Sequence, residues 1–228
     1  MQIRAVAYLN QEGAALLAAG DLDTAITIFS HAIELLTQSR GFEAAPEIAL
    51  AFWSKSLPFD AQTPSVSRRC SHSQQARDLL VDSSKDDGSY FVYSNPLVFH
   101  SDIAMAADSA VNCASVVLFN MALAWHQRGR LADSRALLRA RILYDMSLQM
   151  VAKMSSNYNC ANVTVAAINN KAHIHFECSD VGNAKTTLYD LLALLSQKNC
   201  KPPFEELEIE KFYMNILFLN ATTMAGAA

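Results

Sequence analysis

Hydrophobic residues recur at helical spacing along most of the chain and predict helices joined in pairs by short turns. Between Ala5 and Leu36, two apolar stripes with spacings of three and four residues are separated by Gly20-Asp21. Gly20 suits a left-handed helix end, and an aspartate after it can accept hydrogen bonds from the free N–H groups of the next helix. The stretch 116–151 predicts a second helical pair, with its turn at Gly129.

The region 38–114 breaks this pattern. Residues 41–57 can form one more helix and residues 75–81 a short one, between Ser-rich polar tracts that have little to bury. The stretch YFVYSNPLVFH (90–100) is aromatic and β-branched around a Ser-Asn-Pro turn signal. We expect a short extended segment packed on the helices here, and no real sheet.

Three segments each contain a pair of small residues at matching positions, Gly13/Ala25, Ala122/Ala140 and Ala172/Ala184. This pattern resembles the tetratricopeptide repeat (TPR), a 34-residue helical hairpin, and the resemblance implies that the small residues lie where the two helices of a hairpin touch. The spacing within a pair is 12, 18 and 12 residues, respectively. The middle hairpin is therefore expected to hold six additional residues in its turn or at a helix start. Ser179-Asp180 replaces the Gly-Asp turn in the third.

The resemblance implies an all-α fold, an α-α superhelix of TPR-like hairpins with a long irregular insertion. We expect one helical domain over 1–228, made of repeat 1 (about 5–37), the insertion (about 57–112), repeat 2 (about 114–152), repeat 3 (about 162–196) and a C-terminal capping helix (about 204–220). The order of these segments also resembles that of uncharacterised repeat proteins of unicellular algae, a likeness that implies no activity.

Stacked hairpins of this kind form a concave groove lined by their first helices, and a partner peptide usually lies in it. An asparagine side chain there can donate to and accept from a peptide backbone at once. In the alternative reading, Asn120 and Asn170 bond neighbouring helices instead. The residues expected in the groove are Asn10, Phe119, Asn120, Leu123, His126, Asn169, Asn170, His173 and Phe176.

The histidines and arginines offer weaker chemical signals. His173 and His175 lie two residues apart on a helix and point away from each other, so they cannot jointly bind a metal. We expect His175 to pack or hydrogen-bond, and we expect no metal, cofactor or catalytic site. A basic cluster could bind phosphate or RNA as the alternative function, or be a solvated face answered by Asp133, Asp145 or the acidic helix Glu205 to Glu210. It comprises Arg128, Arg130, Arg135 and Arg139.

Composition narrows the function classes. The net charge is −4 and the chain has 51% hydrophobic residues, so a folded core is expected and nucleic-acid binding is disfavoured. No stretch of about 18 apolar residues occurs and no leader precedes the first helix, which favours a cytoplasmic or nuclear protein without a membrane partner. Leu17, Phe119 and Phe176 are expected to be exposed and to favour a homo-oligomer. The sequence favours a non-enzymatic module for a protein or peptide partner.

Overall fold

The computed structural model describes residues 2–38, 90–99, 109–131, 133–154, 160–197 and 204–225. Within these ranges the protein contains seven α-helices and no strand, which confirms the predicted all-α class. The helices expected over 41–57 and 75–81, and the Ser-rich tracts, lie outside the described residues. The helices are α1 (Gln2–Ala18), α2 (Leu22–Thr37), α5 (Ser109–Arg130), α6 (Ser134–Ala152), α7 (Cys160–Glu177), α8 (Val181–Leu195) and α9 (Glu206–Ala225).

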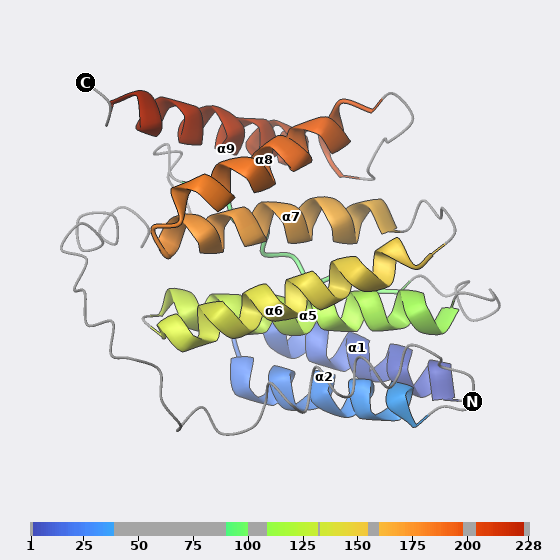
Figure 1. Cartoon of the computed structure of the whole chain (residues 1–228). Helices are drawn as coiled ribbons and strands as arrows, with labels where there is room; N and C mark the ends of the chain where they lie inside the picture. The colour runs from blue at the N-terminus through green and yellow to red at the C-terminus, as the bar shows by residue number, and fades with distance from the viewer. Residues whose placement is uncertain are drawn as a thin grey trace.

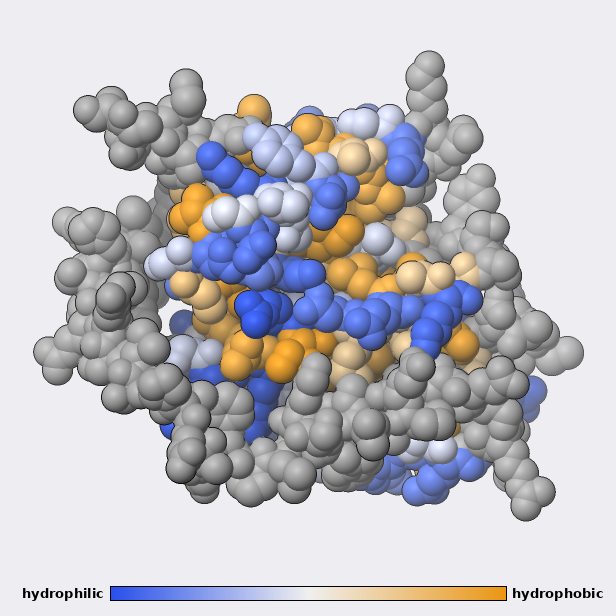
Figure 2. Space-filling view, viewed as in Figure 1, coloured by the Kyte–Doolittle hydropathy of each residue, from blue (hydrophilic) through white to orange (hydrophobic). Residues whose placement is uncertain are grey.

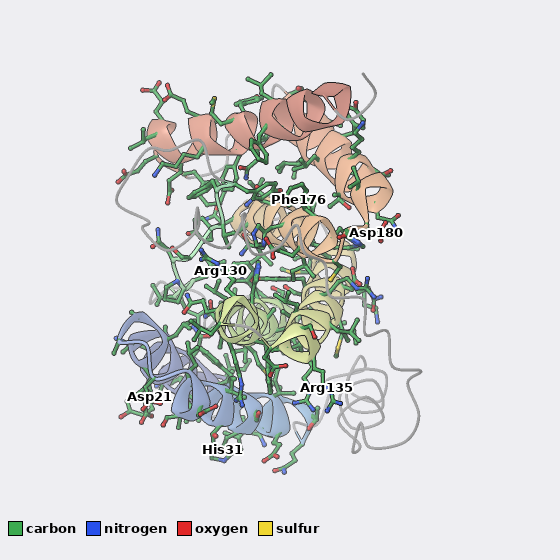
Figure 3. The ribbon with its side chains drawn as sticks, turned by 90° about the vertical axis from the view of Figure 1, so that its left-hand side faces the viewer. Asp21, His31, Arg130, Arg135, Phe176 and Asp180 are labelled. Atoms are coloured by element: carbon green, nitrogen blue, oxygen red, sulfur yellow. The ribbon has the colours of Figure 1, made fainter. Side chains whose placement is uncertain are left out.

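The helices stack in chain order, with α1 and α2 at one end and α9 at the other (Figure 1). Each helix packs against the next, and α1 also contacts α5, which in turn contacts α7. The first helices of successive pairs are thus neighbours. A side view shows α5 and α7 on one side of the stack and α6 and α8 on the other (Figure 3).

The turns of the first and third helical pairs have the same geometry. Gly20 and Ser179 have positive φ angles of 83° and 60°, and the amide of the following aspartate donates to the carbonyl five residues earlier. Asp21 and Asp180 then begin the next helix by accepting a hydrogen bond from its backbone. The Gly-Asp signal and its Ser-Asp replacement therefore end one helix and start another in the same way.

Small residues allow the helices of each pair to approach closely. A Cβ atom built on Gly13 would lie 2.6 Å from the Phe29 ring, and one on Gly129 would lie 2.5 Å from the Leu137 side chain. Larger residues would force these helices apart. All six small residues predicted at helix contacts are buried, namely Gly13, Ala25, Ala122, Ala140, Ala172 and Ala184.

The second pair differs from the prediction in the position of its turn. Gly129 lies inside α5, which continues to Arg130, and three residues separate α5 from α6, as many as in the other two pairs. α5 extends eight residues beyond Ala122, whereas α1 extends five beyond Gly13, and α6 begins six residues before Ala140, whereas α2 begins three before Ala25. The six additional residues therefore lengthen two helices by three residues each, and Gly129 serves close packing instead of the turn.

Candidate peptide-binding site

Five asparagines lie on the first helices of the three pairs and on the last helix, α9. Each is at most 1% exposed, and we call this set the asparagine ladder. Four of them are among the residues expected in the groove, and the fifth is on α9. The ladder comprises Asn10 on α1, Asn120 on α5, Asn169 and Asn170 on α7, and Asn215 on α9.

Residues 90–99, here called the internal segment, lie along this ladder without helix or strand structure, as the sequence predicted. The N–H of Phe91 donates to Asn215 Oδ1 (2.7 Å), and Asn215 Nδ2 donates to the carbonyl of Phe91 (2.7 Å). Asn170 bonds both backbone groups of Tyr93 in the same way, at 2.9 and 2.8 Å. Asn120 does so for Leu97, at 2.8 and 2.7 Å. Three ladder asparagines therefore each bind one residue of the internal segment through both backbone groups.

The remaining ladder members reinforce these bonds. Asn169 Nδ2 donates to the Phe91 carbonyl and Asn10 Nδ2 to the Leu97 carbonyl, each at 3.0 Å. The ladder is also linked internally, because Asn120 donates to Asn10 (2.9 Å) and Asn215 to Asn169 (2.6 Å). The alternative reading is confirmed, since Asn120 donates to Asn10 on α1 and Asn170 donates to the Tyr144 hydroxyl on α6, while binding of a partner peptide stays a prediction.

The aromatic side chains at the start of the internal segment fill sites lined by other rings. Tyr90 lies against His173 (ring centroids 5.1 Å apart) and stacks on Phe176 (6.3 Å). The Tyr90 hydroxyl donates to the main-chain carbonyl of Asn169 at 3.2 Å. Burial raises the pKa of Tyr90, so the phenol remains neutral.

Tyr93 fills a second aromatic site, between α5 and α9. Its ring centroid lies 5.4 Å from Phe204, 6.2 Å from Phe119 and 6.3 Å from Phe212. The Phe91 ring also packs against Phe212, edge to face, with the ring centroids 5.4 Å apart. Burial, with the charge of Glu208, raises the pKa of Tyr93 to about 12.

Two predicted groove histidines meet beneath Tyr90. His126 Nε2 and His173 Nδ1 are 3.0 Å apart, and His126 Nδ1 lies 3.4 Å from the Tyr144 hydroxyl. Burial, with a smaller contribution from Arg130, lowers the pKa of His173 to about 3. Burial, His173 and Arg130 lower the pKa of His126 well below 6.5. Both rings are therefore neutral near pH 7, and the His126 ring lies against the rings of His173 and Tyr144.

Other predicted positions have different environments. Leu123 is fully buried in the helical core. The expectation that Leu17 and Phe119 are exposed is wrong, because they are 2% and 0% exposed, and Phe176 is half-buried beside Tyr90. The internal segment covers the two phenylalanines, so this argument for a homo-oligomer is lost. His175 Nδ1 donates a hydrogen bond to the Asp180 carboxylate at 3.1 Å, as its predicted role requires.

Asn215 was missed by sequence reasoning. It follows Phe212 by three residues within a strongly apolar stretch, FYMNILFLN, and a single asparagine among apolar residues was the available signal. The sequence alone indicates either a capping helix or the start of a truncated fourth repeat here, and neither interpretation assigns this asparagine to a binding face.

The arginines of the basic cluster lie in different environments. Arg128 pairs with Asp23 and lies 3.8 Å from Asp133, and both Arg128 and Arg139 lie over the Trp125 ring. Arg130 and Arg135 are labelled on different sides of the α5–α6 pair (Figure 3). Asp145 pairs with Lys171 at 2.6 Å.

The outer face of the stack, where α6 and α8 lie in front, has a mixed surface. Figure 2 shows hydrophilic side chains in a broad band across its middle, with hydrophobic side chains above and below the band. Binding of phosphate or RNA by the basic cluster stays a prediction without a specific structural observation in its favour.

The described residues define an all-α protein of paired helices whose first helices hold an irregular segment of the same chain. Comparison with family models, curated proteins and solved structures found no match to this chain. Within the described ranges, no helix is long and apolar enough to cross a membrane. The same residues contain no group of three or more His, Cys, Asp or Glu side chains placed to hold a metal ion.

Proposed function

We propose that this protein is a non-enzymatic protein–protein interaction module. In this proposal its hairpins form a TPR-like superhelical array, and its asparagine ladder binds an extended segment of a partner protein. The predicted groove then corresponds to the face on which the internal segment lies.

One observation carries the proposal: Asn215, Asn170 and Asn120 each bond both the N–H and the C=O of a single residue in a segment without secondary structure. An asparagine amide offers one acceptor and two donors, so it satisfies an extended backbone as a neighbouring strand would. Such bonds require no particular side chain on the bound residue. The ladder can therefore bind an extended segment from another protein as well as its own.

The test is selection of peptides from a random ten-residue library against full-length protein. The target carries Tyr90→Ser and Tyr93→Ser, which weaken the hold of the internal segment. Selected peptides are synthesised, and their dissociation constants are measured by fluorescence anisotropy. Adding Asn120→Ala and Asn170→Ala is expected to weaken binding at least about tenfold, because two paired hydrogen bonds to the peptide are lost at each position.

Asn183→Ala is the matched control. Asn183 lies at the start of α8, where it bonds Asp180 and is exposed, so its removal should leave the dissociation constant unchanged. Circular dichroism confirms that each variant keeps its helices. Peptides that bind the ladder variants as tightly as the parent, or a selection without binders, would contradict the proposed function.

A further inference from the structure

The internal segment is bound by side chains of the helices and not by backbone–backbone hydrogen bonds. Between described residues, none of its N–H or C=O groups forms a backbone–backbone hydrogen bond. Its main-chain bonds go to the ladder asparagines, and the helices contact one another directly from α1 to α9. The stack therefore has helix–helix interfaces of its own, and Tyr90, Val92 and Tyr93 of the segment complete the hydrophobic core beside them.

We propose that residues 90–99 are an internal copy of the ligand, so that a partner segment of similar chemistry binds by displacing them. This inference rests on the proposed function and adds the chemical class of the partner. The partner is an extended segment with aromatic residues at the first, second and fourth of its positions, corresponding to Tyr90, Phe91 and Tyr93.

The side-chain sites define these positions. Tyr90 and Tyr93 are 6% and 5% exposed and lie in separate sites lined by rings, so aromatic side chains are required at the first and fourth positions. Phe91 is half-buried, with its ring against Phe212 and the Lys211 ammonium 5.2 Å from its centroid. The second position therefore favours an aromatic ring over an aliphatic side chain.

The sixth position favours a hydrogen-bond donor or a positive charge. Asn95 Nδ2 donates to Glu208 Oε1 at 3.2 Å, and Glu205 and Glu206 lie in or beside the same first turn of α9. A lysine or arginine at this position would gain a carboxylate partner, whereas an aspartate or glutamate would be repelled. Ser94 and Val98 are exposed, and their counterparts in the partner are unconstrained.

The internal segment competes with a free peptide for the ladder, because it is tethered beside it. The internal segment belongs to the same chain, so its effective concentration at the ladder is on the order of millimolar. A free peptide of the same sequence must exceed this concentration to replace it. Weakening the internal copy while leaving the ladder intact should therefore raise the affinity for the free peptide.

The experiment uses full-length protein and a fluorescent peptide of sequence YFVYSNPLVF followed by two lysines for solubility. Tyr93→Ser protein is expected to bind this peptide at least about tenfold more tightly than wild-type protein, because its own segment loses one aromatic anchor. Phe91→Ser, at a half-buried position, is the second variant if Tyr93→Ser loses its helices. Val98→Ser, at an exposed position, is the matched control and should bind as wild type does.

The peptide supplies a second control when its first and fourth tyrosines are changed to serine, which should abolish binding. Equal affinity of wild-type and weakened proteins, or equal binding of the serine peptide, would overturn the inference. If library peptides bind through the ladder but lack the aromatic positions, the proposed function stands and this inference fails. If no peptide binds through the ladder, both fail.

Discussion

The two halves of the internal segment are bound in different ways. Residues 90–93 lie in aromatic sites beside α7 and α9, and three of these four residues are buried. Residues 94–99 are exposed or half-buried, and among them only Leu97 is bonded to the ladder. Backbone recognition thus runs along the whole segment, whereas side-chain burial is concentrated at its start. The first half should supply most of the binding free energy and selectivity. The second half should mainly determine the direction in which the segment lies along the ladder.

The largest expected difference between the halves comes from removing one buried ring. Tyr93→Ala should lower the free energy of unfolding by about 3 kcal/mol, within the range for buried aromatic residues, because the site between Phe119, Phe204 and Phe212 is left empty. Val98→Ala in the second half should change it by less than about 0.5 kcal/mol. Urea unfolding followed by circular dichroism measures both. Equal effects would remove the distinction between the halves.

Removing a ladder asparagine should lower the free energy of unfolding more in the first half than in the second. Asn170→Ala leaves the buried N–H and C=O of Tyr93 and the Tyr144 hydroxyl without this partner, and should cost about 2–4 kcal/mol. Asn120→Ala should cost less, about 1–2 kcal/mol, because Leu97 is half-exposed to water and Asn10 still donates to its carbonyl, although the buried Asn10 Oδ1 loses the bond from Asn120. A larger loss for Asn120→Ala in urea unfolding would contradict this order.

Acid should destabilise the first half through the histidine pair. The pKa of His173 is lowered to about 3 and that of His126 is also lowered, so the unfolded chain binds more protons than the folded one below pH 6.5. Their contribution to stability is complete above pH 6.5 and falls by about 1.4 kcal/mol per histidine for each pH unit below it.

Urea unfolding at pH 7.0, 6.0 and 5.0 tests this effect. In His173→Gln protein the slope of stability against pH should decrease by about one proton. His31→Gln, at an exposed position on α2, is the control and should keep the wild-type slope. An unchanged slope in His173→Gln protein would contradict the assignment of the lowered pKa.

The smallest expected effect lies where the two halves join. Glu208→Gln keeps a hydrogen-bond acceptor for the exposed Asn95 side chain, so stability should change by less than about 0.5 kcal/mol. Binding of a peptide with lysine at the sixth position should nevertheless weaken, because the carboxylate charge is lost. Anisotropy titrations with the asparagine and lysine peptides separate these two outcomes, and equal changes for both peptides would contradict the charge argument.

Local signals explain what the sequence could predict. Gly20 and Asp21 determine a turn through the φ angle of one residue and the cap of the next, and Asn10, Asn120, Asn169 and Asn170 occupy a register within single helices. These features depend on residues close in the chain. The helical pairs and four of the five ladder positions could therefore be identified from the sequence.

Long-range packing explains what the sequence could not predict. The occupation of the ladder by residues 90–99 depends on bonds across 23 to 124 positions, such as those of Leu97 with Asn120 and of Phe91 with Asn215. Those contacts bury Phe119 and half-bury Phe176, which a helix pattern alone left exposed. Gly129 was misplaced because a close approach to Leu137 and a turn both favour glycine.

The most direct test of the central claim is amide hydrogen exchange by NMR at the internal segment. The amides of Phe91 and Tyr93, and to a lesser degree Leu97, should be protected in wild-type protein, whereas those of Ser94, Asn95 and Val98 exchange rapidly. Asn170→Ala should release Tyr93 most strongly while the amides of α5 and α6 remain protected. Uniformly rapid exchange across 90–99, or unchanged protection of Tyr93 in Asn170→Ala protein, would contradict binding of an extended backbone by the asparagine ladder.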